Sequence, residues 1–312
     1  MENIILSAAV ESALKAGKPV LALESTVITH GLPYPQNLEI AHLLEQTALE
    51  HKVTPATIAV IDGNIHIGLE DKDFERLAEL SQAAQADRSL LNKIAMRDIP
   101  LALAENWSGG TTVSATVYCA HLAGIRVFAT GGIGGVHRFW TESFDISADL
   151  PALAKYPVIV VTAGCKAILD IPATLEQLET LSVPVYGWRT DLCPAFYTRE
   201  SAYHIDRVDS IQTIAAAYRA ANALAQSKGG ISSGMVIMNP IPAEHSIPSE
   251  LIEPVIQQAI REAEQLGISG KAITPWLLQR LSESTRGQSI AANLELLKNN
   301  VRLGCGIATE LS

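Results

Sequence analysis

A lysine stands where a strand-like apolar run ends. Lys166 follows the run Val158 to Thr162 through three small residues. A lysine delivered from a buried strand tends to lose its proton, because desolvation disfavours the ammonium form. A neutral amine is what a Schiff base requires, so Lys166 is a candidate nucleophile. The spacing leaves a second interpretation equally open, a surface lysine paired with Asp170 one helical turn later.

A carboxylate, like Lys166, stands at the end of a strand-like apolar run. Glu24 follows Val20 to Leu23 and precedes Ser25 and Thr26. Ligands in layered α/β folds collect beyond the carboxyl ends of strands, which makes Glu24 a candidate acid. The alternative is a solvated loop glutamate, and the usual exposure of acidic residues favours it.

Four glycines follow the run Ile125 to Ala129, in the segment Thr130 to Arg138. Glycines let backbone N–H groups approach an anion closely, and His137 and Arg138 add donors or charge. The segment predicts a phosphate cradle. It is not a dinucleotide fingerprint, since His137 stands where the third small residue belongs. A tight turn is the alternative, but one turn needs fewer glycines.

Hard oxygen ligands come next, in the segment Phe144 to Asp149. Asp145, Ser147 and Asp149 are residue types that suit Mg²⁺ or Mn²⁺. From spacing alone, Asp149 could equally cap a helix beginning at Leu150.

Two further segments could bind an anion. Gly109 to Thr112 opens an apolar helix, whose free N–H groups suit phosphate, although an ordinary N-cap is the alternative. Lys93 precedes Arg97 and Asp98 and could reach a phosphate, although such clusters are commonly solvated turns. The eight histidines form no HExxH pair, which argues against zinc.

Short apolar strands alternate with helical segments, which predicts an α/β layered fold with a mixed, largely parallel sheet covered on both faces. Asp62-Gly63 predicts a hairpin within Thr57 to Leu69. Ser227 to Gly230 is the best candidate linker, but apolar sequence resumes after it, so we expect a single domain over residues 1–312. The clearest predicted strands are Pro19 to Leu23, Ile125 to Ala129, Val158 to Thr162, Val183 to Tyr186 and Met235 to Met238. The predicted helices are Gln36 to Glu50, Thr112 to Ala123, Ile211 to Ala225, Leu251 to Leu266 and Ser289 to Leu297.

Composition limits the function classes. The chain has 312 residues, 48% of them hydrophobic, and a net charge of -10. This balance gives no basic surface for nucleic acid, although a local nest of N–H groups could still bind a small anion. The apolar runs are shorter than the roughly 20 residues that span a bilayer, and the amino terminus has no signal-peptide pattern. The four cysteines form no CxxC pair, which is typical of reduced, buried thiols. We therefore expect a cytoplasmic protein with neither nucleic-acid nor membrane partners.

Taken together, these segments resemble the pseudouridine-5'-phosphate glycosidases, also known as the indigoidine synthase A-like family. The resemblance runs in order from about Pro19 to Asn300. It rests on Ala22 to Thr26, Pro35 to Asn37, Phe128 to Arg138 (FATGGIGGVHR), Phe144 to Leu150 (FDISADL), Ala163 to Lys166 and Asn239 to Pro242.

The resemblance implies a trimeric, three-layer α/β/α enzyme. It would reversibly split the carbon–carbon glycosidic bond of pseudouridine 5'-phosphate into uracil and ribose 5-phosphate, a reaction of pseudouridine catabolism. Lys166 would be the nucleophile, Glu24 the proton donor, and Asp145 the ligand of one Mn²⁺ per subunit, or of Mg²⁺ or another divalent ion. The residues implied to contact substrate are Lys93, Thr112, the Val113 backbone, Thr130, His137, Ser147, Ala148, Asp149 and Asn293.

The sequence departs from the family pattern in a few places. Met96 stands where a second arginine commonly precedes Arg97, and Cys165 stands where alanine is common. Two rival functions remain at this stage. A Schiff-base aldolase or sugar-phosphate lyase would use the same lysine without processing uracil. A sugar-phosphate-binding accessory protein would need neither Glu24 nor Lys166.

Overall fold

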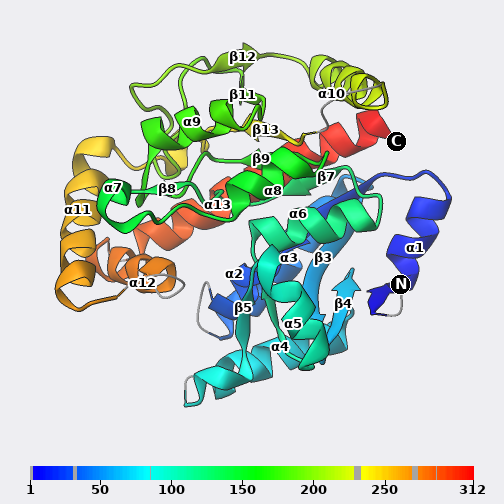
Figure 1. Ribbon diagram of the computed structural model, residues 1–312, viewed down its shortest axis with the longest axis horizontal. Coiled ribbons are helices and arrows are strands. Elements are labelled where there is room, and N and C mark those ends of the chain that lie inside the picture. Colours follow the sequence, from blue (N-terminus) through cyan, green and yellow to red (C-terminus); the bar gives the residue numbers. More distant parts are fainter. Residues whose placement is uncertain (1–2, 31–33, 85, 228–232, 269–272, 286) are drawn as a thin grey trace.

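The computed structural model describes residues 3–30, 34–84, 86–227, 233–268, 273–285 and 287–312. A mixed, mostly parallel sheet forms its centre (Figure 1). The strands are β1 (Ile4–Leu6), β2 (Val20–Glu24), β3 (Thr54–Ile61), β4 (Asn64–Ile67), β5 (Asn92–Ile94), β6 (Gly109–Thr111), β7 (Val127–Ala129), β8 (Val136–His137), β9 (Ile159–Thr162), β10 (Leu169–Asp170), β11 (Val185–Trp188), β12 (Asp206–Val208) and β13 (Met235–Met238).

The main path of the sheet runs β1-β4-β3-β2-β7-β9-β13-β11-β12, and β6 joins β5 to β3. All neighbours from β3 to β12 along this path pair in parallel, so their carboxyl ends lie at one edge. β8 and β10 form a separate antiparallel pair. The five predicted strands all exist with bounds close to those expected.

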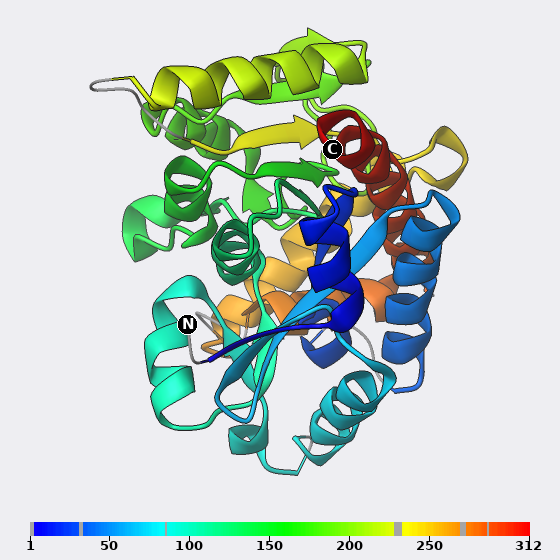
Figure 2. The same cartoon turned by 90° about the vertical axis from the view of Figure 1, so that its right-hand side faces the viewer.

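Helices cover both faces of the sheet. They are α1 (Ala8–Lys15), α2 (Thr26–His30), α3 (Gln36–Glu50), α4 (Asp71–Ala83), α5 (Ile99–Ala104), α6 (Val113–Leu122), α7 (Trp140–Ser143), α8 (Asp149–Lys155), α9 (Ile171–Thr180), α10 (Ile211–Ala225), α11 (Ser249–Gln265), α12 (Ile273–Ser284) and α13 (Gln288–Leu311), with 3-10 turns η1 (Arg88–Leu90), η2 (Met96–Asp98) and η3 (Ala243–His245). Figure 2 shows α3 and α13 on one side of the sheet, with α6 and α8 on the other. The predicted three-layer α/β/α class is confirmed.

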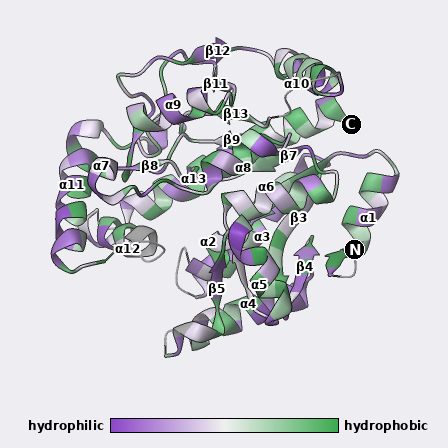
Figure 3. Ribbon diagram, in the orientation of Figure 1, coloured by the Kyte–Doolittle hydropathy of each residue, from purple (hydrophilic) through white to green (hydrophobic). Residues whose placement is uncertain are grey.

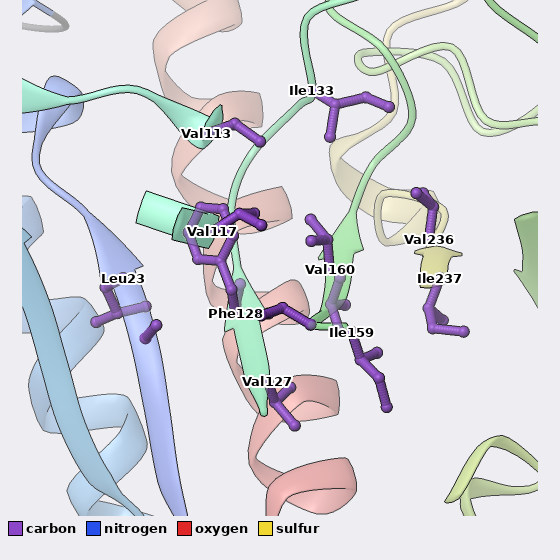
Figure 4. Packing of buried hydrophobic residues seen from close by; sticks show 14 of the residues in the cluster. Leu23, Val113, Val117, Val127, Phe128, Ile133, Ile159, Val160, Val236 and Ile237 are labelled. Carbon is purple, nitrogen blue, oxygen red and sulfur yellow. The ribbon is translucent and has the colours of Figure 1, made fainter. Parts of the chain in front are cut away.

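The central strands are buried on both faces, which explains their continuous apolar sequence. Figure 4 shows Phe128 of β7, Val160 of β9 and Val236 of β13 in the core, together with Val117 of α6. Each of these side chains is fully buried.

Surface helices have only one apolar face. Figure 3 shows both hydrophilic and hydrophobic segments along α11, whose buried residues include Ile252, Ile256 and Ile260.

The predicted hairpin is confirmed. β3 and β4 pair antiparallel with Ile61 opposite Asn64, and Asp62-Gly63 forms the turn. Both turn residues have left-handed backbones, with φ of 45° and 75°, as a two-residue hairpin of this kind requires.

Helix α13 is much longer than predicted. Its sequence suggested an end at Leu297, but it continues to Leu311 through Asn300, Gly304 and Gly306. These residues are poor helix formers, so tertiary packing rather than local preference must stabilise the second half of the helix. A side chain at Gly304 would lie 2.9 Å from a methyl group of Leu21, so glycine lets the helix approach the sheet closely.

A second correction concerns Gly109 to Thr112. Gly109, Gly110 and Thr111 form strand β6, and α6 begins only at Val113, with Thr112 as its N-cap. A side chain at Gly109 would lie 2.0 Å from the Asn92 carbonyl oxygen, so close strand packing explains this glycine.

The candidate linker Ser227 to Gly230 lies outside the described residues from residue 228 onward. Of the helices in the described part of the chain, none is long and apolar enough to cross a membrane.

Candidate active site

Three loops bring the candidate residues to one edge of the sheet. Glu24 ends β2, Thr130 directly follows β7, and Lys166 follows β9. These strands are neighbours and parallel, so the residues after them lie close together.

A cleft opens between these loops. Glu24 and Lys166 both line it, and about 820 Å³ of unoccupied space, continuous with solvent, lies within it. A concave site that combines apolar walls with a few polar and charged side chains is typical of a small-molecule ligand. The other lining residues are Thr26, Val27, His30, Lys93, Thr112, Gly131, Gly132, Ala167, Ile168, Phe196, Tyr197, Leu281, Asn293 and Leu297.

Two threonines fix the Glu24 carboxylate. The Thr26 hydroxyl donates to one carboxylate oxygen and the Thr130 hydroxyl to the other. Thr130 is fully buried and does not line the cleft. The sequence implied that Thr130 contacts substrate, whereas the structure places it behind Glu24.

Backbone contacts fix the Lys166 loop to the glycine segment. The Lys166 N–H donates to the Ile133 carbonyl at 3.0 Å, and the Ile133 N–H donates to the Gly164 carbonyl at 3.1 Å. Gly164 has a φ of 98°, and a side chain there would lie 2.3 Å from the Pro194 carbonyl oxygen. Only glycine fits this turn.

The alternative interpretation of Lys166 as a surface ion pair does not hold. The Asp170 carboxylate accepts a 3.0 Å hydrogen bond from the Ala173 N–H and caps α9. No ion pair joins Asp170 to Lys166 within the described residues. Lys166 is half-buried in the cleft wall.

Arg138 has a role that the sequence did not indicate. We expected it to contribute charge to an anion cradle. Its guanidinium instead contacts Glu253 of α11 at 2.5 and 3.0 Å. It also donates to the carbonyls of Ala167 at 3.2 Å and Leu169 at 3.4 Å. Arg138 therefore holds the chain that directly follows Lys166.

In the glycine segment, Thr130 to Arg138, two of the glycines allow close packing within the protein rather than anion binding. The Gly134 N–H donates to Asp149 and the Val136 N–H donates to Thr174, so these groups are engaged within the protein. Side chains at Gly134 and Gly135 would lie 2.2 Å from the Ser147 hydroxyl and 2.4 Å from the Thr174 hydroxyl. The predicted cradle is therefore reduced to its first part, Gly131 and Gly132, which line the cleft.

Asp149 does not cap a helix beginning at Leu150, which was one of the two interpretations of the sequence. It is the first residue of α8 rather than its cap, and only 4% of it is exposed. Its two carboxylate oxygens accept 2.8 Å hydrogen bonds from the N–H groups of Ser114 and Gly134. Asp149 thus caps a different helix, α6, and ties it to the glycine segment.

His137 and Asp145 form a pair beside the cleft, with 3.8 Å between the His137 Nδ1 and an Asp145 oxygen. Burial lowers the pKa of His137, the Asp145 charge opposes this, and the Lys166 and Lys93 charges lower the pKa further. Burial thus favours the neutral imidazole, and Lys166 and Lys93 lie close enough to His137 for their charges to act in the same direction.

Asp145 was predicted to hold a divalent ion. Over the described ranges of the chain, no group of three or more His, Cys, Asp or Glu side chains is arranged to hold a metal. Asp145 and the adjacent His137 would hold such an ion only with water as most of its ligands, as Mg²⁺ commonly allows.

Five of the predicted site residues meet in the cleft: Glu24, Lys93, Thr112, Lys166 and Asn293. Seven others do not line it, namely Val113, Thr130, His137, Asp145, Ser147, Ala148 and Asp149. Val113 is fully buried at the start of α6. Ser147 and Ala148 are half-buried between the glycine segment and α8.

Sequence reasoning missed several residues of the cleft. Thr26 stands two residues after Glu24, and this spacing could have indicated its hydrogen bond. Phe196 gave no signal, although its left-handed backbone (φ 64°) is a strained conformation of the kind found at functional sites. Cys165, behind Lys166, is a buried thiol whose pKa burial raises to about 12, so it remains protonated.

Comparison with known proteins shows which family the chain is similar to. Residues 9–310 match the family model of the indigoidine synthase A like proteins. The chain is 49% identical to the pseudouridine-5'-phosphate glycosidase of Caldanaerobacter subterraneus subsp. tengcongensis, over 99% of this chain and 97% of that protein. It is 50% identical to the enzyme of that name from Paracoccus denitrificans, over 99% of this chain and 98% of that protein.

Two solved structures share the fold. The prealnumycin C-glycosynthase AlnA, in complex with ribulose 5-phosphate, superimposes with a TM-score of 0.88 at 35% identity and covers 100% of this chain and 97% of its own. An indigoidine synthase A-like protein from Thermotoga maritima superimposes with a TM-score of 0.86 at 33% identity, over 99% of this chain and 96% of its own.

Proposed function

Because the chain belongs to the family of indigoidine synthase A like proteins, we propose that it is a pseudouridine-5'-phosphate glycosidase. It reversibly cleaves the C–C glycosidic bond of pseudouridine 5'-phosphate to uracil and ribose 5-phosphate. The observation that carries this proposal is the presence of Glu24 and Lys166 in the wall of one cleft. An accessory binding protein would need neither an acid nor a nucleophile there.

A lysine nucleophile is needed because the atom that leaves the sugar is a carbon atom. Ordinary glycosidases protonate a heteroatom with one carboxyl group of a pair, but here the leaving atom is carbon 5 of uracil. The neutral Lys166 amine adds to C1′ as the bond between C1′ and the ring oxygen breaks, and the proton that leaves the nitrogen passes to that oxygen. The nitrogen lone pair then forms an imine as the C1′–C5 bond breaks, and C5 takes a proton from Glu24. Water hydrolyses the imine and frees Lys166 and ribose 5-phosphate.

We assign the phosphate end of the substrate to Lys93 and Thr112, which line the same cleft as Lys166. Lys93 supplies positive charge, and Thr112 is the N-cap of α6, whose amino end suits an anion. Holding the phosphate keeps the opened sugar within reach of Lys166. The pentose 5-phosphate bound to the C-glycosynthase neighbour supports this assignment. Asn293 of α13 lines the same cleft and is a further substrate contact.

A divalent ion, Mn²⁺ or Mg²⁺, is proposed at Asp145 with water as its main ligand. When bound, it would supply positive charge that orients the substrate. Through the family resemblance we also propose a cytoplasmic homotrimer of three 33.4 kDa chains. Analytical ultracentrifugation measures this mass directly, and a monomer would contradict it.

Condensation tests the function. The protein, uracil and ribose 5-phosphate together with Mn²⁺ should yield pseudouridine 5'-phosphate. Omitting the metal, or using ribose in place of ribose 5-phosphate, should greatly reduce the yield. Glu24→Gln and Lys166→Arg should each lower kcat about 10³-fold while the fold persists, since each removes a group that acts on the reacting atoms. Turnover of another phosphosugar without any consumption of uracil would favour a sugar-phosphate lyase instead.

A further inference from the structure

A line of buried polar groups runs from the carboxyl end of β13 to the Glu24 carboxylate. The Asn239 side-chain N–H₂ donates to the Asn300 side-chain oxygen at 3.0 Å. The Asn300 N–H₂ donates to the Thr130 carbonyl at 2.8 Å, and the Thr130 hydroxyl donates to Glu24. Asn300 and Thr130 are fully buried, and Asn239 is 4% exposed.

This line connects four separate elements. Asn239 follows β13, Asn300 lies in the second half of α13, Thr130 follows β7, and Glu24 ends β2. The Asn239 N–H also donates to the Thr162 carbonyl at the end of β9, at 2.7 Å. The ends of four neighbouring strands are thus joined by hydrogen bonds.

Asn300 is not the residue that packing alone would favour. Asparagine is a poor helix former, and an apolar side chain would suit a fully buried position on α13. Its two bonds matter because they hold Thr130. The Thr130 N–H donates to the Val161 carbonyl at 3.0 Å, and its carbonyl accepts from Asn300. With the backbone held on both sides, the Thr130 hydroxyl has a fixed position from which to hold Glu24.

We propose that Asn300 is a positioning residue for the proton donor: it fixes Thr130, and Thr130 orients Glu24. The inference rests on the proposed function, in which Glu24 protonates the leaving uracil carbon. Asn300 touches neither the cleft nor the reacting atoms. Its replacement therefore lowers kcat more than it changes KM.

The next residue of the helix supplies a matched control. Asn299 is also an asparagine on α13, and its N–H₂ donates to a backbone carbonyl, that of Pro240, at 3.0 Å. That bond ties α13 to the segment after β13 but does not reach Thr130. Asn299→Ser and Asn300→Ser thus remove the same chemical group from adjacent positions.

The experiment compares wild type, Asn299→Ser, Asn300→Ser, Thr130→Val and the Thr130→Val/Asn300→Ser double variant. Four quantities are measured: kcat and KM for condensation of uracil with ribose 5-phosphate, the yield of borohydride-trapped ribose 5-phosphate, and the urea midpoint. We expect Asn300→Ser to lower kcat about tenfold with little change in KM, because small displacements of a catalytic group are costly. Asn299→Ser should stay within about twofold of wild type, since it leaves Thr130 in place.

The double variant separates positioning from general stability. If Asn300 acts through Thr130, its loss should add less than about threefold to the effect of Thr130→Val. Trapping at Lys166 should persist in every variant, because imine formation on free ribose 5-phosphate does not remove uracil.

Equal losses in Asn299→Ser and Asn300→Ser, or losses that multiply in the double variant, would overturn the inference. If Asn300→Ser does not fold, Asn239→Ser reaches the same line from β13 and should lower kcat without raising KM; an unchanged kcat there would also overturn it. Failure of the wild type to trap ribose 5-phosphate would instead count against the proposed function.

Discussion

Two hydroxyl groups hold the Glu24 carboxyl group, and this choice of partner suits a proton donor. The Thr26 and Thr130 hydroxyls each donate to one of its oxygens. A hydroxyl can donate to a carboxylate and can also accept from a carboxylic acid, whereas an arginine can only donate. The same contacts can therefore hold Glu24 in both its protonated and its ionised form, as the proposed proton donor requires.

A second carboxyl group, that of Glu45, does not line the cleft, but its burial affects the stability of the protein. It lies on α3 and accepts a 2.6 Å hydrogen bond from the Thr57 hydroxyl. Burial raises its pKa from 4.5 to about 7, and the bond from Thr57 opposes this. The folded state therefore binds this proton more tightly than the unfolded state, and stability falls as pH rises from about 4.5 through about 7.

Glu45→Gln should remove this pH dependence. Glutamine carries no charge and can still accept from Thr57, so the variant should be more stable than wild type at pH 8 by on the order of 1–3 kcal/mol. At pH 4 the two proteins should be nearly equal, because Glu45 is then largely protonated in both the folded and the unfolded state. Thermal melts at both pH values measure the difference, with exposed Glu50→Gln on the same helix as the control. A gap of the same size at both pH values would contradict this explanation.

Residue types and order marked Glu24 and Lys166 as candidates, because each stands near the end of an apolar strand. The family resemblance then favoured them over a solvated glutamate and a surface ion pair. Residue types and order could not predict where Thr130, Arg138 and Asp149 point. The partners of these three side chains come from segments distant in sequence: Glu24, Glu253 and Ser114. Such pairings follow from the order of the strands in the sheet, which sequence periodicity does not specify.

At the scale of elements, the loop after β9 depends on a helix that is remote in sequence. Arg138 bridges Glu253 of α11 to the carbonyls of Ala167 and Leu169. The side chains of Arg138 and Glu253 are 24% and 36% exposed, so the ion pair itself contributes little to stability, about 1 kcal/mol or less. Its main effect is on the position of Lys166.

Glu253→Gln should therefore lower kcat about tenfold, since it releases the guanidinium that holds the lysine loop. The control is Glu262→Gln on the same helix, where the lost partner is Arg280 of α12 at 2.7 Å. The control should lose less than about twofold in kcat, with a similarly small loss of stability. Steady-state kinetics and urea unfolding of both variants test this, and equal kinetic effects would rule out a special role for Glu253.

Elements with a clear local signal were predicted closely. The helices Gln36–Glu50 and Ile211–Ala225 and the strand Met235–Met238 have the predicted bounds, because periodicity and flanking residues agree there. The second half of α13 was missed because its asparagines and glycines are locally unfavourable for a helix. They are explained only by contacts with Pro240, Thr130 and Leu21.

At the scale of the whole molecule, one apolar core joins the first helix to the last. The main cluster of buried residues includes Val10 of α1 and Leu311 of α13, and a smaller cluster under α4 contains Phe74. Helix α13 lies against β2, β7 and β9, so the carboxyl terminus completes the core beneath the active site (Figure 1).

We expect the chain to unfold in one cooperative transition, as a single shared core requires. Tryptophan fluorescence and far-ultraviolet circular dichroism should give the same urea midpoint. A chain ending before Gln288 should not fold, because the central strands would lose the cover of α13. Two separated transitions, or a folded truncated chain, would show that the core is divided.

The central claim is that Lys166 forms an imine with the sugar, and one measurement tests it most directly. The protein is mixed with ribose 5-phosphate, reduced with borohydride, digested, and mapped by mass spectrometry. The predicted result is a single reduced ribose 5-phosphate adduct on the peptide that contains Lys166, absent in Lys166→Arg and retained in Glu24→Gln. An adduct on another lysine such as Lys93, or no adduct in a protein that makes pseudouridine 5'-phosphate, would contradict the mechanism.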